Sequence, residues 1–321
     1  MPPPEERAVL AGGKPGVGPA EKERGFADAW QRLAWAWPFW MASPALWLLV
    51  LIAVPVGLRA RGDGLFPAMA TLGIVAHAFA TLTSVVGSWP ATRLAASGAI
   101  VAAGAWGVEL LGSTTGYPFG AYHYTPALQP QLGGVPVAIP LAWFMMLLPS
   151  WAVADAILDG PRWSATAGTP GGVRWRYRLL HAGLAGLAFT AWDLYLDPQL
   201  VSRGLWVWER PGDYFGIPWT NFAGWWLAAG LLTLAAGFLR SDEGRWRAAD
   251  QSAAASDTSS LGARRLQAAR MRLMLVYTLT WAFQALGLGL FWGQPGPALA
   301  GFAGMGVFVA LAWLKTLRLW T

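Results

Sequence analysis

The sequence predicts an all-α fold, a polytopic bundle of about eight transmembrane helices, with seven as the alternative. Of the 321 residues, 55% are hydrophobic and only 12% are charged, which is about half the charged share of an ordinary soluble domain. Apolar stretches long enough to cross about 30 Å of hydrocarbon recur along the chain. Strands of a membrane barrel would be about half as long and would alternate polar with apolar residues. Helices are therefore expected.

The eight apolar stretches follow one another along most of the chain. In order they are Met41–Leu58, Leu65–Val86, Leu94–Gly112, Val135–Leu158, Arg178–Asp197, Gly216–Leu239, Met271–Trp292 and Pro297–Leu314. The first and the last are short enough to lie at the membrane interface instead, which leaves seven spans as the alternative. Residues 41–321 are expected to form a single transmembrane helical domain.

Two segments are too polar for the bilayer. Residues 1–40 begin with many Pro, Gly and charged residues, and we expect a disordered cytoplasmic tail followed by an interfacial segment. No apolar run follows closely enough for a signal peptide. Residues 241–269 contain an Ala/Ser/Asp/Thr stretch and are expected to form a flexible cytoplasmic loop.

The distribution of Lys and Arg predicts the orientation. Of the 23 basic residues, 19 lie in the tails and even-numbered loops, and only four, Arg59, Arg61, Arg203 and Arg210, lie in the odd-numbered loops. Cytoplasmic segments carry the basic excess, so both termini are predicted to be cytoplasmic and the protein to reside in the plasma membrane. The net charge of +6 is then a topology signal, and no nucleic-acid partner is expected.

An internal repeat indicates where the functional site lies. The first copy runs from Glu109 through Gly120-Ala-Tyr-His-Tyr124 and Gly134-Val-Pro136 to Leu141-Ala-Trp-Phe144. The second runs from Asp193 through Gly204-Leu-Trp-Val-Trp208 and Gly216-Ile-Pro218 to Phe222-Ala-Gly-Trp-Trp226. Each copy is a span, an outer loop and a span, so the copies are predicted to be parallel repeats about an axis along the membrane normal.

The two outer loops are rich in aromatic residues. Candidates for contact with a ligand are Tyr117, Tyr122, Tyr124, Trp206, Trp208 and Tyr214 in the loops, and Trp192 and Tyr195 on the span between them. Aromatic belts also occur at membrane interfaces without any ligand. The paired pattern favours loops that fold over the bundle.

Three carboxyl groups lie near the outer ends of their spans: Glu109, Asp193 and Asp197. An Asp at the bilayer centre costs about 2.5–3.5 kcal/mol, so a carboxyl group within a span is expected to have a structural or functional role. Asp193 and Asp197 are four residues apart and share a helical face. Two carboxyl groups so close do not both ionise readily, so one is expected to keep a proton and to be able to act as a general acid. Helix caps or polar contacts between helices are the structural alternative.

Other polar residues give weaker signals. His123 lies in the first aromatic loop and is a functional candidate, and Asn221 is either a helix N-cap or a hydrogen-bonding site residue. His77, His181 and Asp155 are expected to be structural. No span contains a Lys for a retinal Schiff base, and three scattered His with no Cys predict no zinc or di-iron site and no cofactor.

The chain resembles the carotenoid biosynthesis membrane proteins of the CruF type, which are carotenoid 1,2-hydratases. The segments that carry the resemblance are Gly116-Tyr-Pro-Phe-Gly-Ala-Tyr-His-Tyr124, Gly134-Val-Pro-Val-Ala-Ile-Pro140, Asp193-x3-Asp197-Pro, Gly204-Leu-Trp-Val-Trp208 and Tyr214-Phe-Gly-Ile-Pro-Trp-Thr-Asn-Phe222. It covers residues 109–226 well and the other spans only as generic helices.

The resemblance implies addition of water across the terminal C1=C2 double bond of an acyclic (ψ) carotenoid end group. The substrate would be an acyclic or monocyclic carotenoid such as lycopene or γ-carotene, held in membrane lipid, and association with other carotenoid-pathway enzymes is a further expectation. On chemical grounds Asp193 or Asp197 is the acid, and Glu109 or His123 positions or deprotonates the water. Protonation of C2 would leave a tertiary cation at C1, and aromatic faces would stabilise this cation.

Three alternatives remain open from the sequence. A carotenoid end-group cyclase would use the same protonation and quench the cation with a ring double bond. A polyprenyl transferase is suggested by Asp193-x3-Asp197, although magnesium–diphosphate sites lie on the cytoplasmic side with several basic residues. A lipid or carotenoid transporter or scaffold is the non-enzymatic alternative.

Overall fold

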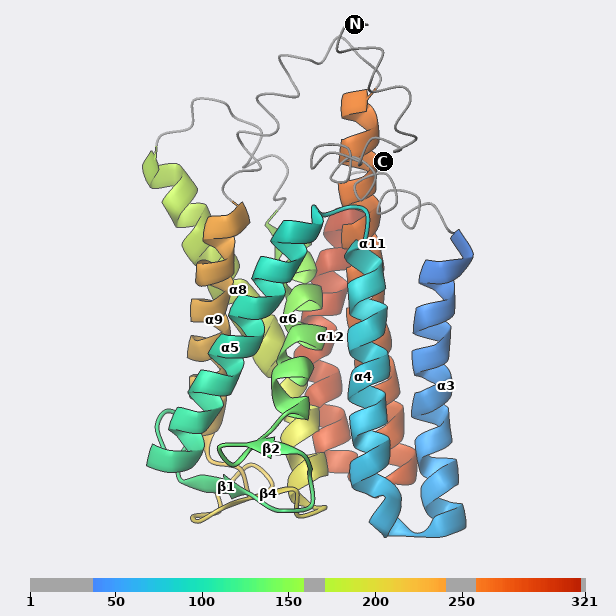
Figure 1. The fold of residues 1–321 in the computed structure, drawn as a ribbon, viewed down its shortest axis with the longest axis vertical. Helices are drawn as coiled ribbons and strands as arrows, with labels where there is room; N and C mark the ends of the chain where they lie inside the picture. Colours follow the sequence, from blue (N-terminus) through green and yellow to red (C-terminus); the bar gives the residue numbers. More distant parts are fainter. Residues whose placement is uncertain (1–36, 159–170, 241–257, 319–321) are drawn as a thin grey trace, which may run out of the picture.

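The computed structural model describes residues 37–158, 171–240 and 258–318. The predicted N-terminal tail and residues 241–257 of the predicted flexible loop lie outside the described residues. Within them, the first helix begins and the last helix ends at the same end of the bundle, opposite the strands (Figure 1).

The described part of the chain contains eight α-helices, and each contains most of one predicted span. Their bounds are α3 Trp37–Arg61, α4 Phe66–Val85, α5 Ala91–Thr115, α6 Ala138–Ile157, α8 Gly171–Val201, α9 Trp219–Arg240, α11 Thr258–Leu286 and α12 Pro295–Arg318. Seven of them are long and apolar enough to cross a membrane. The eighth, α9, has 22 residues, opens with the polar pair Thr220-Asn221, and runs beside α5 along the bundle (Figure 1).

One predicted loop is partly wrong. Residues 241–269 were expected to be flexible throughout, but α11 begins at Thr258. Its first turns contain Arg264, Arg265 and Arg270, which hydrocarbon would not accept. The helix therefore continues beyond the apolar stretch that the hydropathy of the sequence detects.

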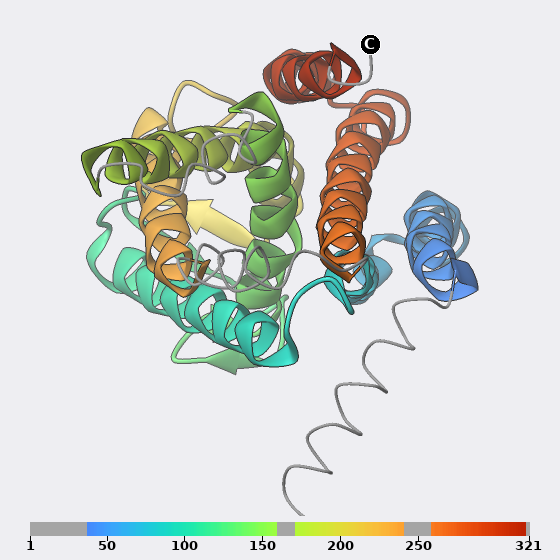
Figure 2. The same ribbon diagram turned by 90° about the horizontal axis from the view of Figure 1, so that it is seen from above.

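Four helices form a ring. Neighbours around it contact one another in the order α5, α6, α8, α9 and back to α5, and Figure 2 shows α5 and α8 on opposite sides. The remaining helices lie outside the ring: α4, α11 and α12 contact α6, α12 also packs on α8, and α3 packs on α4. The ring is thus the part of the fold with an interior.

Short strands cap one end of this ring. Strand β1 (Tyr122–Tyr124) pairs antiparallel with β4 (Trp206–Trp208), with Tyr122 opposite Trp208 and Tyr124 opposite Trp206. A second pair, β2 (Gln131–Leu132) and β3 (Val135–Pro136), lies beside it. Because successive side chains of a strand point to opposite faces, the aromatic residues of β1 and β4 face the ring, and His123 and Val207 face away.

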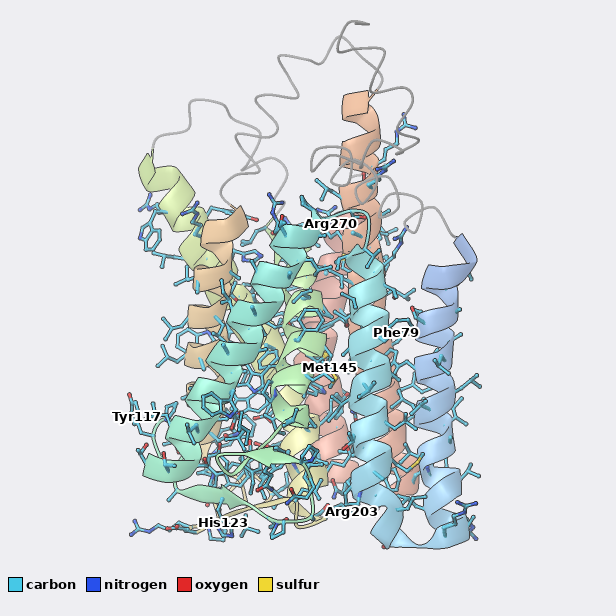
Figure 3. The ribbon with its side chains drawn as sticks, in the orientation of Figure 1. Phe79, Tyr117, His123, Met145, Arg203 and Arg270 are labelled. Atoms are coloured by element: carbon cyan, nitrogen blue, oxygen red, sulfur yellow. The ribbon has the colours of Figure 1, made fainter. Side chains whose placement is uncertain are left out.

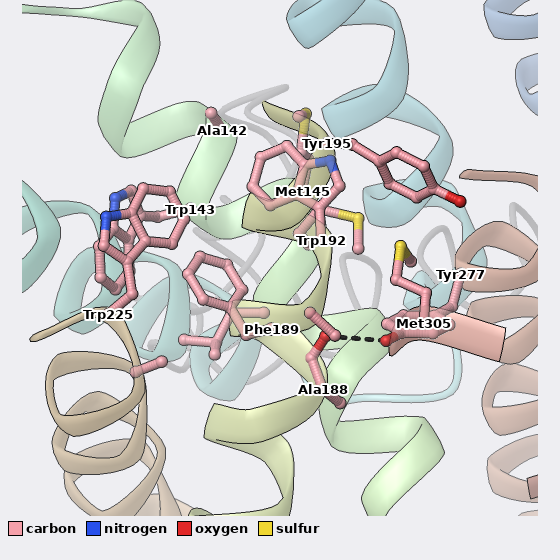
Figure 4. Close-up of a cluster of buried hydrophobic side chains, with 14 of the residues drawn as sticks. Ala142, Trp143, Met145, Ala188, Phe189, Trp192, Tyr195, Trp225, Tyr277 and Met305 are labelled. Carbon is pink, nitrogen blue, oxygen red and sulfur yellow. Dashed lines mark hydrogen bonds between the residues drawn. The ribbon is translucent and has the colours of Figure 1, made fainter. Parts of the chain in front are cut away.

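The ring interior is filled with aromatic side chains. Trp143 of α6 lies 5.0 Å from Trp225 of α9 and 4.8 Å from Phe189 of α8, measured between ring centroids. Trp192 meets Phe189 edge-on at 5.8 Å. Figure 4 shows these rings together in the core, with Tyr277 of α11 donating a hydrogen bond to the carbonyl of Ala188 at 2.8 Å.

The two units of the predicted repeat, α5–α6 and α8–α9, make up the ring. Corresponding helices lie diagonally opposite, and the two Gly-x-aromatic-x-aromatic segments pair with each other as β1 and β4. Parallel units around an axis along the membrane normal would adopt this arrangement. The repeat itself stays a prediction.

Candidate active site

A small cavity lies inside the ring, directly under the strand cap. Its volume is about 20 Å³, which is room for about one water molecule. Residues from all four ring helices and from β1 and β4 line it: Glu109, Tyr122, Tyr124, Ile139, Ala142, Trp143, Leu196, Asp197, Trp206, Trp208, Asn221 and Trp225. Two of the three predicted carboxyl groups, Glu109 and Asp197, therefore line one cavity.

Glu109 of α5 is 2% exposed and is held by three donors. Its Oε2 accepts hydrogen bonds from the hydroxyls of Tyr122 and, at 2.8 Å, of Tyr124. Its Oε1 accepts one from Nε1 of Trp143 at 3.1 Å. Each carboxylate oxygen offers two lone pairs, so Oε2 is fully occupied and Oε1 keeps one lone pair.

The two tyrosines remain neutral donors. Burial raises the pKa of both Tyr122 and Tyr124, and the neighbouring Glu109 carboxyl adds to the effect. Ionised phenolates could not donate to Glu109. Burial likewise raises the pKa of Tyr214, whose hydroxyl donates to the carbonyl of Leu194 at 2.8 Å.

Asp193 and Asp197 lie on successive turns of α8 and are almost completely buried. The amide nitrogen of Asn221 donates to Oδ2 of Asp193 at 2.8 Å and to Oδ2 of Asp197 at 2.5 Å. Nε1 of Trp206 donates to Oδ1 of Asp197 at 3.2 Å.

Because one nitrogen of Asn221 contacts Oδ2 of both aspartates, the two carboxyl groups lie close together. Two buried carboxyl groups at this spacing do not both ionise readily, so we expect the pair to keep a proton. Only Asp197 reaches the cavity wall, and Asp193 lies behind it. The arrangement can present an acidic proton to whatever enters the cavity.

Aromatic faces make up most of the remaining wall. Trp206 and Trp208 come from β4, and Trp208 is fixed by its Nε1, which donates to the carbonyl of Phe119 at 3.1 Å. Trp143 and Trp225, which the sequence reasoning did not assign to the site, also line it. They stand at equivalent positions of the two predicted copies, and that equivalence was the available signal.

Several predicted site residues lie elsewhere. His123 is exposed on the outer face of β1, and Tyr117 is 69% exposed, so neither reaches the cavity (Figure 3). Trp192, Tyr195 and Tyr214 are buried but do not line it. The hydroxyl of Tyr195 instead donates to the carbonyl of Trp281 at 3.1 Å, toward α11.

His77, His181 and Asp155, which were expected to be structural, make contacts away from the cavity. His181 Nε2 lies 3.1 Å from Oδ1 of Asp155, and the hydroxyl of Tyr177 donates to the same oxygen at 2.8 Å. His77 stacks on Trp47 with ring centroids 4.1 Å apart. None of these residues lines the cavity.

Fold and site together define a polytopic helical membrane protein with a buried carboxyl site walled by aromatic rings. The chain belongs to the carotenoid biosynthesis protein family, which it matches over residues 65–309. The resemblance found in the sequence is thereby confirmed.

One curated relative is the bisanhydrobacterioruberin hydratase of Haloarcula japonica. It is 33% identical to this chain over 186 residues, which are 56% of this chain and 59% of that protein. The match thus spans less than two thirds of the relative's length. No solved structure matches the chain.

Proposed function

We propose that this protein is a carotenoid hydratase, which adds water across the terminal C1=C2 double bond of an acyclic (ψ) end group. The observation that carries the proposal is the Asp193–Asp197 pair, bridged by Asn221, at a water-sized cavity with aromatic walls. Family membership and the hydratase name of the relative support it. Lycopene, γ-carotene or a similar carotenoid is the expected substrate.

The acid is the aspartate pair. Asp197 faces the cavity and donates the shared proton to C2, while Asp193 and Asn221 hold it in position. The π electrons form the new C2–H bond, which leaves a tertiary cation at C1. Water then attacks C1 and loses a proton, giving the 1-hydroxy product. Neither a metal nor a redox cofactor enters this scheme.

The cation is stabilised by the rings of the wall. Trp143, Trp225, Trp206 and Trp208 line the same space as Asp197. A cation over a desolvated aromatic face gains about 2 kcal/mol. Tyr117, Trp192 and Tyr195, which the sequence also indicated as candidates for contact with a ligand, do not line this space.

The site favours hydration over the alternatives. None of the described residues that line the cavity is Lys, Arg or His, so the diphosphate of a polyprenyl transferase would lack its counter-charges. A cyclase would need the acid, the aromatic wall and a base for its final loss of a proton, but it would have no use for space for one water.

The test is expression of the full chain in a lycopene-accumulating bacterium, followed by mass analysis of the pigments. Pigment heavier by one water, or by one water at each end, is the expected result. An isomer of unchanged mass would indicate a cyclase. Unaltered pigment from a protein that accumulates in the membrane would contradict both activities.

A further inference from the structure

We infer that Glu109 decides the fate of the carbocation, directing it to capture by water rather than to loss of a proton. The inference rests on the proposed hydratase function and divides the work of its site. The aspartate pair makes the cation without Glu109, and Glu109 then commits it to hydration.

The first support is that the two carboxyl centres are built separately. Glu109 stands on α5 and is held by Tyr122, Tyr124 and Trp143. The aspartate pair stands on the diagonally opposite helix α8 and is held by Asn221 and Trp206. The two centres share no hydrogen-bond donor among the described residues, so neutralising Glu109 leaves the scaffold of the acid in place.

The second support is the free lone pair on Glu109. Oε2 is occupied by two hydroxyl donors, whereas Oε1 receives only the Trp143 indole N–H. Oε1 can therefore accept one further hydrogen bond, and the cavity beside Glu109 has room for one water. A water hydrogen-bonded to Oε1 is held in one orientation. As the water oxygen bonds to C1, Oε1 can accept the proton that the water loses.

The third support is the lack of another base on the described wall. Apart from Asp197, the polar groups that line the cavity are phenol hydroxyls, indole N–H groups and the Asn221 amide. None of them is basic enough to take a proton from water at neutral pH. Asp197 has just become part of an ionised pair, and it can take a proton back from carbon as readily as from water.

The proton balance defines the two outcomes. In hydration, one proton passes from the aspartate pair to C2, the water oxygen bonds to C1, and one proton passes from water to Oε1 of Glu109. Return of that proton to the aspartate pair through the next water restores both centres. Without Glu109, the cation returns a proton from C2 or from a methyl group on C1 to the aspartate pair. The product is then the starting alkene or an isomer of unchanged mass.

Deuterium separates these outcomes. Membranes containing the protein are incubated with lycopene in D₂O, and both the hydrated product and the deuterium in unhydrated carotenoid are measured. For Glu109→Gln we expect hydration to fall by about 100-fold or more, the range for loss of a general base, with deuterium still entering unhydrated carotenoid. Asp197→Asn should lose both signals. Glu209→Gln, the same change at an exposed residue after β4, should keep both.

Three results decide the inference. Hydration by Glu109→Gln at the wild-type rate overturns it, as does loss of deuterium entry together with hydration in a protein that accumulates normally. A wild-type protein that adds no water refutes the proposed function instead. If Glu109→Gln does not accumulate, Tyr124→Phe takes its place: it removes one of the two hydroxyls that hold Oε2, so the carboxyl group positions the water less firmly and the ratio of hydration to deuterium entry should fall. An unchanged ratio in that variant also overturns the inference.

Discussion

The three buried carboxyl groups differ in the number of hydrogen bonds that they receive. Glu109 accepts three, and Asp197 accepts one from Asn221 and one from Trp206. Asp193 accepts only the bond from Asn221, and no donor among the described residues faces its Oδ1. A buried carboxylate oxygen without a donor is costly, so Asp193 depends on the proton that the pair is expected to keep.

The substitution Asp193→Asn removes one acidic group of the pair and preserves the shape of the side chain. We expect hydration to fall by about 100-fold or more, as for other losses of general acid catalysis, with normal amounts of protein in the membrane. Pigment analysis against membrane protein level measures both. Asp213→Asn, at an exposed loop residue, is the matched control. Wild-type activity in the Asp193 variant would remove Asp193 from the mechanism.

The tyrosines of the site predict an alkaline titration. Burial raises the pKa of Tyr122, Tyr124 and Tyr214 above the ordinary value of about 10. Their contribution to folding stability is complete below pH 10 and is lost as the pH rises toward the folded-state pKa. In purified protein these three of the seven tyrosines should stay protonated at about pH 11 and ionise on unfolding. Tyrosinate absorbance measures this, and ionisation of all seven near pH 10 would contradict it.

Residue types and spacing were enough to single out Glu109, Asp193, Asp197 and Asn221, which the structure brings together and whose roles stay predictions. They did not predict the direction of every loop side chain. His123 was expected in the site with Tyr122 and Tyr124, yet alternation along β1 places it outside. Treating Tyr122-His-Tyr124 as a strand would have placed His123 on the face opposite the two tyrosines. The partner strand is 84 residues away along the chain, however, and local sequence does not reveal such a pairing.

At the scale of elements, two helices are fitted closely around the loop that carries β1. Phe119 is buried between α5 and α9. Each helix has a glycine where it meets the Phe119 ring, Gly112 in α5 and Gly224 in α9. A Cβ atom added to Gly224 would lie 2.7 Å from the Phe119 ring and 3.0 Å from the Pro118 carbonyl, and one added to Gly112 would lie 2.5 Å from the ring. Since the Phe119 carbonyl holds Trp208, this contact links the helix packing to the cavity wall.

Gly224→Ala should therefore destabilise the protein. Overpacking of this kind costs about 1–3 kcal/mol, and displacement of Phe119 should also lower activity. Gly183→Ala on α8 is the control, because an added Cβ there meets nothing within 4 Å. Thermal unfolding in detergent compares the two variants. Equal midpoints would show that the Phe119 loop is looser than its contacts indicate.

The spans were predictable because a helix that crosses a bilayer must be apolar over the thickness of the hydrocarbon core. All eight predicted stretches lie largely within helices, seven of which are long and apolar enough to cross a membrane. The first and last residues of the helices were not predictable in the same way. Helix α11 starts at Thr258 in a polar segment, where hydrogen bonding along the backbone continues although the membrane no longer requires it.

At the scale of the whole molecule, the ring could not be read from spans alone. Hydropathy gives the number and direction of helices, but which helices are neighbours depends on side-chain packing such as the Trp143–Trp225 contact. The predicted repeat pointed to both outer loops, and these do lie together over the cavity. The orientation of the bundle in the membrane stays a prediction of the Lys and Arg distribution.

Single cysteines test that orientation, because the chain has none of its own. His123→Cys, exposed at the capped end, should react with an impermeant maleimide added to intact cells. Arg264→Cys, exposed near the start of α11 at the other end, should react only after permeabilisation. The reverse pattern would place both termini outside, and the cavity would then open toward the cytoplasm.

The diagonal placement of α5 and α8 has a stereochemical consequence. If the hydron donor and the nucleophile reach the alkene from two fixed and opposed walls, each addition occurs on one face of the planar end group. Deuterium delivered to C2 would then occupy a single prochiral position. The two geminal methyl groups, equivalent by connectivity in the tertiary alcohol, would likewise keep the identities that they had on the double bond.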